Sequence, residues 1–114
     1  MSGFKLTVRH GAKVDREDHA TLAQAVAALR ARAERVRAEG GLPEVSMLRS
    51  YEPGAQVDAR LEISTGGPFR GRDAGVDVMG DGELVPFRGG VFRKPLTPAP
   101  GESAFDAVEN ALRG

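Results

Sequence analysis

The sequence predicts a two-layer α+β fold, in which an antiparallel β-meander of about five strands packs on one long helix and a short C-terminal helix follows. Three observations support this prediction. Apolar side chains over residues 21–39 recur with the helical period, strand-like alternation occurs before and after that segment, and a second helical pattern closes the chain. At 114 residues, the chain is expected to form one domain, residues 1–114.

The chain begins with a strand pattern. Phe4, Leu6 and Val8 alternate with charged or polar residues, which is the period of a half-buried strand. Gly11 interrupts this alternation. Val14 then fits either a short second strand or a turn.

The long helix is predicted over residues 21–39. Thr21 and Gln24 have the spacing of a capping box at its start, and the glycine pair 40–41 supplies its stop. At 1.5 Å per residue this helix would be about 28 Å long, enough to cross a small domain. Between its ends, apolar residues recur at intervals of four, three, four and three on one narrow stripe: Leu22, Val26, Leu29, Ala33 and Val36.

Strand patterns fill most of the second half of the chain. One covers residues 45–51, and a further one is indicated at about 90–94. The most regular covers residues 56–64, where every second residue is apolar: Val57, Ala59, Leu61 and Ile63. Such complete alternation predicts one face in the core and one in water.

A hairpin is predicted around the Asp-Gly pair at 81–82, a preferred two-residue turn. As a two-residue loop, this pair sets Val78 opposite Val85 and Val76 opposite Phe87. All four side chains then share one face, which predicts that they lie in the core.

The same register makes two predictions about the outer face of the hairpin. Met79 and Leu84 would lie there as a small apolar pair, either covered by the C-terminal helix or forming part of an interface. Arg88 would have Asp73 and Asp77 on its two cross-strand diagonals, close enough to neutralise its charge.

A proline-rich connector over residues 95–101 leads to the second helix. Ser103 and Asp106 have cap spacing at its start. One side of this short helix is apolar and is expected to dock on the body or on a partner: Phe105, Val108 and Leu112.

Composition limits the function classes. Sixteen basic and sixteen acidic side chains give a net charge of zero, which argues against binding nucleic acid or a membrane with the whole surface. There is no cysteine, no signal-like start and no apolar run of the roughly 20 residues that a membrane helix needs. We therefore expect a cytoplasmic protein.

The tetrapeptide Pro-Phe-Arg-Gly occurs twice, at 68–71 and at 86–89. Aromatic rings, guanidinium groups and flexible glycines together suit the binding of anions or nucleic acid. The second copy belongs to the predicted hairpin, whereas the first lies in a glycine-flanked loop without a nearby carboxylate until Asp73. The candidate binding residues are therefore those of this loop: Phe69, Arg70 and Arg72.

No catalytic residue, metal site or cofactor is predicted. The only histidines are His10 and His19, and neither has a local spacing that ties it to a serine nucleophile. On one strand, Asp73 and Asp77 would lie about 13 Å apart, too far for both to bind one calcium ion.

These features predict a small, soluble, non-catalytic binding protein that acts through a protein partner or self-associates as a homodimer. The contact would use sheet edges or the surface around Met79 and Leu84. One alternative is a ligand-binding roll, with or without enzymatic activity, that recognises an anionic small molecule through the loop from Phe69 to Arg72. A second alternative is nucleic-acid binding through three arginines: Arg70, Arg72 and Arg93.

Overall fold

A computed structural model describes residues 3–39, 57–65, 72–89 and 93–113. Within these ranges, eight elements follow one another along the chain: β1 (Phe4–His10), β2 (Lys13–His19), α1 (Leu22–Ala38), β3 (Val57–Thr65), β4 (Asp73–Met79), β5 (Leu84–Arg88), β6 (Lys94–Pro95) and α2 (Ala104–Arg113). The predicted α+β class with one long and one short helix is confirmed.

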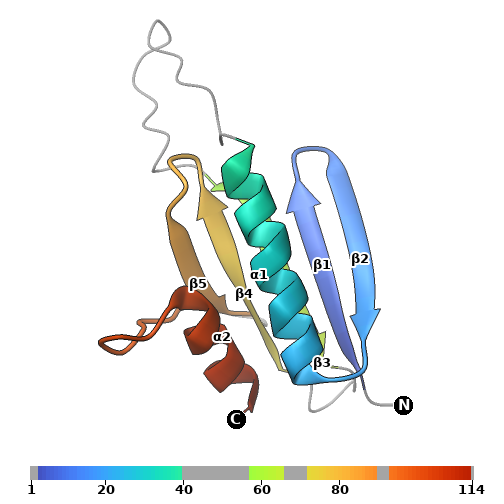
Figure 1. Ribbon diagram of the computed structural model, residues 1–114, viewed down its shortest axis with the longest axis vertical. Helices are drawn as coiled ribbons and strands as arrows, with labels where there is room; N and C mark the ends of the chain where they lie inside the picture. The colour runs from blue at the N-terminus through green and yellow to red at the C-terminus, as the bar shows by residue number, and fades with distance from the viewer. Residues whose placement is uncertain (1–2, 40–56, 66–71, 90–92, 114) are drawn as a thin grey trace, which may run out of the picture.

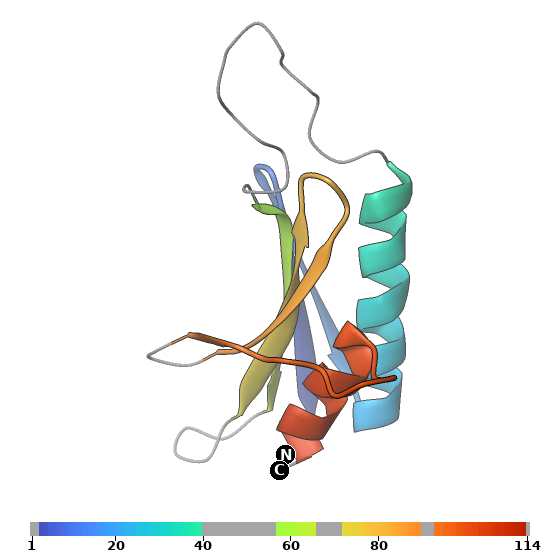
Figure 2. The same cartoon turned by 90° about the vertical axis from the view of Figure 1, so that its left-hand side faces the viewer.

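The six strands form one antiparallel sheet in the order β2-β1-β3-β4-β5-β6. Figure 1 shows α1 crossing the middle of the sheet, with α2 beside it over β4 and β5. In the edge-on view of Figure 2 both helices lie on the same side of the sheet. No helix of the described ranges covers the other side, which we call the open face.

The core fills the space between the sheet and the two helices. The predicted stripe of α1 faces it, with Leu29 fully buried and Leu22 partly buried at the edge. From α2, Val108 is fully buried in the same cluster. The alternating residues predicted for the regular strand are buried except for Val57, which is 42% exposed.

Side-chain caps fix the starts of both helices, as the spacing predicts. The Thr21 hydroxyl oxygen accepts a hydrogen bond from the Gln24 backbone N–H at 3.1 Å, and the Gln24 side-chain oxygen accepts one from the Ala20 N–H at 3.2 Å. At α2, Ser103 Oγ accepts from the Asp106 N–H and Asp106 Oδ2 accepts from the Ser103 N–H, both at 3.1 Å.

The segment before α1 is a full strand. Of the two readings for Val14, a strand or a turn, the strand is the one observed, and it is seven residues long. The turn at Gly11, whose φ is 63°, folds this segment back so that β2 pairs with β1 over all seven residues. Five of these seven residues are charged at neutral pH and a sixth is histidine, so composition alone gave little sign of a strand.

The predicted two-residue turn at 81–82 is wrong by one residue. The Met79 backbone N–H donates to Glu83 O and the Gly82 N–H donates to Met79 O, both at 2.8 Å. Gly82 has a φ of 91°, the left-handed conformation that ends a three-residue hairpin loop. Asp81 stabilises this loop, because its Oδ1 accepts from the Glu83 N–H at 2.9 Å.

The longer loop shifts the pairing of β5 by one residue and reverses its faces. Val78 lies opposite Leu84, and Gly75 lies opposite Phe87. Leu84 therefore packs against the core, whereas Met79 lies on the open face by strand alternation. The predicted outer pair of Met79 and Leu84 is wrong, because their side chains lie on opposite faces.

Two further strands were predicted, over residues 45–51 and at about 90–94. The predicted strand over 45–51 lies outside the described residues. The last strand, β6, contains only Lys94 and Pro95, so it begins near the end of the predicted 90–94 segment. None of the helices in the described ranges is long and apolar enough to cross a membrane.

Candidate functional site

The open face carries charges of both signs on neighbouring strands. Strand alternation and register place four basic and four acidic side chains there: Lys5, Arg9, Arg16 and Arg60, with Asp18, Glu62, Asp73 and Asp77. Arg93, just before β6, joins them because its guanidinium lies over the ring of Phe87. The charged groups at the centre of this face, around Arg60, Glu62 and Arg93, define the candidate site.

Phe87 is the aromatic centre of the site. It is 2% exposed, although it lies on the face that the helices do not cover. The ring is covered by arginines: the guanidinium carbon of Arg93 lies 4.8 Å from the ring centroid, and that of Arg60 lies 5.8 Å away. Both distances are within the range of cation–π attraction. Phe87 is thus buried as the sequence predicted, but on the opposite face.

Arg60 is held by Asp77 on the next strand. Its Nε donates to Asp77 Oδ1 at 2.7 Å and its Nη2 donates to Oδ2 at 3.2 Å, a two-point pair. The hydrogen bonds that Arg60 donates to Asp77 raise the pKa of Arg60 above its ordinary value. The sequence predicted Arg88 as the partner of Asp77, which is wrong: Arg88 pairs with Ala74 and lies on the helix side.

Glu62 occupies the middle of the open face. An added Cβ on Gly89 would lie 2.9 Å from the Asp73 Cβ and closer still to a Glu62 carboxylate oxygen, so the glycine makes room for this carboxylate. Among the described residues no cation lies within 4.0 Å of it. Burial is the largest cause that raises the pKa of Glu62 above its usual 4.5, and the negative charge of Asp73 adds to it. Three nearby arginines oppose this rise without cancelling it: Arg93, Arg60 and Arg9.

Replacing Glu62 by glutamine is expected to stabilise the protein at neutral pH. Because the folded state binds the proton of Glu62 more tightly than the unfolded chain does, stability falls as pH rises from below 4.5 through the raised pKa. Glu62→Gln mimics the protonated form and removes this loss. Urea unfolding followed by circular dichroism should give a higher free energy of unfolding for the variant at pH 7 and equal values near pH 3. A variant less stable than the wild type at pH 7 would contradict the argument.

A second polar cluster lies where β1 meets the start of β3. The register shift between Val57 and Ala59 is a β-bulge, and the bulged residue Asp58 hydrogen-bonds to His10. The distance from His10 Nε2 to Asp58 Oδ1 is 3.2 Å, and His10 Nδ1 lies 3.9 Å from Glu39 Oε1. A histidine oriented by a carboxylate can act as a general base, but within the described ranges no hydroxyl hydrogen-bonds to it. These contacts connect Glu39, at the C-terminal end of α1, through His10 to Asp58 on the sheet.

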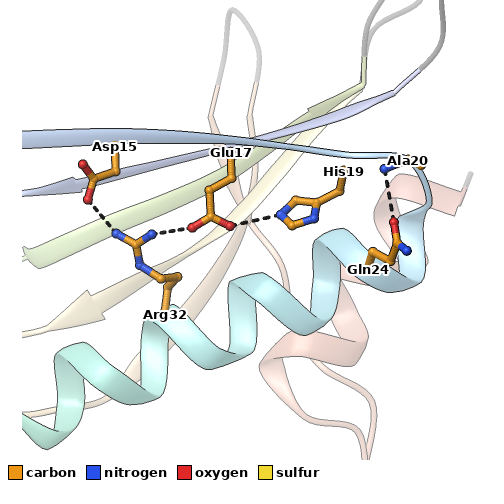
Figure 3. A network of polar contacts seen from close by, with 6 residues as sticks. All are labelled: Asp15, Glu17, His19, Ala20, Gln24 and Arg32. Atoms are coloured by element: carbon orange, nitrogen blue, oxygen red, sulfur yellow. Dashed lines mark hydrogen bonds and ion pairs between the residues drawn. The ribbon is translucent and has the colours of Figure 1, made fainter.

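A third cluster connects α1 to β2 (Figure 3). Arg32 donates through Nη2 to Asp15 Oδ2 at 2.7 Å and through Nη1 to Glu17 Oε2. Glu17 also contacts His19, with 3.1 Å between Oε1 and Nε2. Burial disfavours the charge of Arg32, but the hydrogen bonds to the two carboxylates outweigh it and raise its pKa.

The sequence-predicted loop site is only partly visible. Phe69 and Arg70 lie outside the described residues. Arg72 is exposed at the end of the loop, where its backbone pairs with Thr65: the Arg72 N–H donates to Thr65 Oγ1 at 2.6 Å and Arg72 O accepts from the Thr65 N–H at 2.9 Å. Of the two described arginines proposed for nucleic acid, Arg72 and Arg93, it is Arg93 that the structure brings to the open-face cluster.

Sequence reasoning missed Glu62 and Arg60, which it assigned only to the polar side of a regular strand. A signal for them existed at Gly75. A glycine inside a strand often marks a close approach of neighbouring groups. Here an added Cβ on Gly75 would lie 2.8 Å from the Glu62 Cα.

Among the described residues no group of three or more histidine or acidic side chains is placed to hold a metal ion. Comparisons of the chain with protein-family models, with curated proteins and with solved structures find no match. The function must therefore be argued from the site itself.

Proposed function

We propose that this protein is a small binding protein whose open face recognises a protein partner. The observation that supports this most is the arrangement at the centre of that face. Arg60 and Arg93 are held over the buried ring of Phe87, while Glu62 lies beside them without an ion pair within the described residues. Fixed groups of both charges, partly removed from water, favour a partner of complementary charge pattern.

The mixture of signs favours a protein over a polyanion. Nucleic acid is bound by surfaces of predominantly positive charge, because each phosphate contact needs a cation. Here Asp73 and Asp77 on β4 and Glu62 on β3 lie among the arginines. A protein partner can offer a carboxylate to Arg93 and a cation to Glu62 at the same time.

Apolar side chains adjoin the charged centre at one end of the open face. Val57 lies opposite Met79 in the register and is 42% exposed, and Val85 follows on β5. Interfaces are enriched in methionine, arginine and aromatic side chains, with apolar area beside polar groups. Met79 thus stays in the proposed interface, with Val57 and Val85 rather than Leu84 as its neighbours.

The cost of Glu62 to stability fits this proposal. Burial raises the pKa of Glu62, so the ionised side chain weakens the folded state at neutral pH. Residues that lower stability without a structural gain are expected at functional positions, where binding and not folding determines the side chain.

The proposal is tested by affinity capture from a lysate of the source cells, with the double variant Glu62→Gln plus Arg93→Ala compared with the wild type. Arg88→Ala is the matched control, because Arg88 is also exposed but lies on the helix side. We expect a protein that binds the wild type and Arg88→Ala and is lost with the double variant. Calorimetry with that protein, purified, should then show at least about a tenfold lower affinity for the double variant.

Capture that is equal for the wild type and the double variant would contradict the proposal. Of the alternatives, the anion-binding roll depends on the loop from Phe69 to Arg72, and nucleic-acid binding depends on Arg70, Arg72 and Arg93. They stay predictions, because Phe69 and Arg70 lie outside the described residues.

A further inference from the structure

The two edges of the sheet are unlike. β6 closes one edge with only two residues, one of them proline, which has no N–H to donate to a further strand. β2 forms the other edge, and all seven of its residues pair with β1 in an unbroken register. Within the described ranges β2 has no strand on its outer side (Figure 1). A long, regular and proline-free edge is a template for a further strand.

The side chains of β2 that point toward α1 are tied back to the helix. Charged side chains on an edge strand normally oppose pairing with another strand. Here Arg32, whose side chain is 23% exposed, binds both Asp15 and Glu17, and His19 contacts Glu17 (Figure 3). Both carboxylates on this side of the strand, Asp15 and Glu17, are therefore already compensated by Arg32 of α1.

From these observations we propose that the protein forms a homodimer by antiparallel pairing of β2 with β2 of a second copy. The dimer would extend the sheet across the two chains. Because the β6 edge is short and contains Pro95, the described part of each chain offers one usable edge. The contact is therefore isologous and closes at two copies instead of growing into a filament. It lies at the edge of the sheet, away from the Phe87 centre of the proposed partner site.

The charges of β2 select one register. With Glu17 on the two-fold axis, Arg16 lies opposite Asp18 of the second copy, and Asp15 lies opposite the second copy's His19. Each of these pairs occurs twice. The single like-charge contact is Glu17 with its own copy, and each Glu17 is already bound by Arg32. A register centred on Arg16 would instead oppose Arg16 to itself and Asp15 to Glu17, which is unfavourable.

Charge exchange on the open face of β2 tests both the dimer and its register. Sedimentation equilibrium over a wide range of protein concentrations should show a weak monomer–dimer equilibrium for the wild type, as expected for a small interface. Arg16→Asp alone and Asp18→Arg alone should each lower the association constant at least about tenfold, because attraction becomes repulsion twice. The double variant, and also an equimolar mixture of the two single variants, should recover association.

Arg88→Asp is the matched control. It makes the same charge change at an exposed position on β5 and should leave association unchanged. A wild type that stays monomeric at all concentrations would overturn the proposal. An association constant that Arg16→Asp leaves unchanged would also overturn it. So would a double variant, Arg16→Asp plus Asp18→Arg, that has the circular dichroism of the wild type but does not associate. Failure here leaves the partner proposal untouched, because Glu62→Gln plus Arg93→Ala acts at the centre of the open face and not at its β2 edge.

Discussion

Gly75→Ala is expected to destabilise the protein by about 3–5 kcal/mol, or to prevent folding, because there is no space for one more carbon atom. A Cβ at this position would lie 2.8 Å from the Glu62 Cα, 2.9 Å from the Leu61 carbonyl carbon and closer still to the Leu61 oxygen. These are backbone atoms of β3, which cannot move away as a flexible side chain could. The methyl group would force β3 and β4 apart in the middle of the sheet.

Gly3→Ala is the matched control, since the nearest atom to its added Cβ is the His19 carbonyl oxygen at 3.6 Å, an ordinary contact. This variant should stay within about 0.5 kcal/mol of the wild type. The chain has no tryptophan, so urea unfolding is best followed by far-ultraviolet circular dichroism. If Gly75→Ala and Gly3→Ala unfold at similar urea concentrations, the close approach of β3 and β4 at Gly75 is incorrect.

The helices and the regular strand could be predicted because their signals are local. Thr21 and Gln24 fix the start of α1 through contacts three or four residues apart, and the apolar stripe that follows fixes its buried side. The alternation of Ala59, Leu61 and Ile63 likewise decides which side of β3 is buried. None of these inferences needs knowledge of the neighbouring strands.

The hairpin prediction failed because two turn types accept the same residues. Asp81 and Gly82 suit a two-residue loop, but they also suit a three-residue loop that starts at Gly80 and ends in a left-handed glycine. The choice between them moves β5 by one residue, and this alone transfers Phe87 from the core side to the open face. A strand containing apolar residues at both parities, Leu84 and Phe87 among them, does not reveal which side is inward.

The site depends on contacts between distant segments, which no local pattern specifies. Arg60 meets Asp77 seventeen residues later, and Arg32 meets Asp15 seventeen residues earlier. The sequence assigned both arginines to solvated faces. Since every strand of a sheet has a polar side, the choice of partner follows from strand order, and strand order was not predicted from the chain alone.

Arg60→Met is expected to lower the free energy of unfolding by about 2–3 kcal/mol, which is more than a change of its partner Asp77 lowers it. The Asp77 side chain is 11% exposed, so removing Arg60 leaves a nearly buried carboxylate without its ion-pair partner. Asp77→Asn should cost only about 1 kcal/mol, because asparagine still accepts a hydrogen bond and the Arg60 side chain, 32% exposed, remains in contact with water. Urea unfolding at pH 7 measures both values, and a larger loss for Asp77→Asn would contradict the assignment of the buried partner.

The double variant Arg60→Met plus Asp77→Met should be more stable than Arg60→Met alone, because it removes the buried charge together with its partner. The methionine at position 60 also keeps an apolar side chain beside the Phe87 ring, where the Arg60 guanidinium lies in the wild type. The cycle formed by Arg60→Met, Asp77→Met and this double variant should therefore give a coupling energy of at least about 1 kcal/mol between the two positions. Additive losses would mean that Arg60 and Asp77 are stabilised independently, and that the two-point pair on the open face is not what holds Arg60 over the aromatic ring.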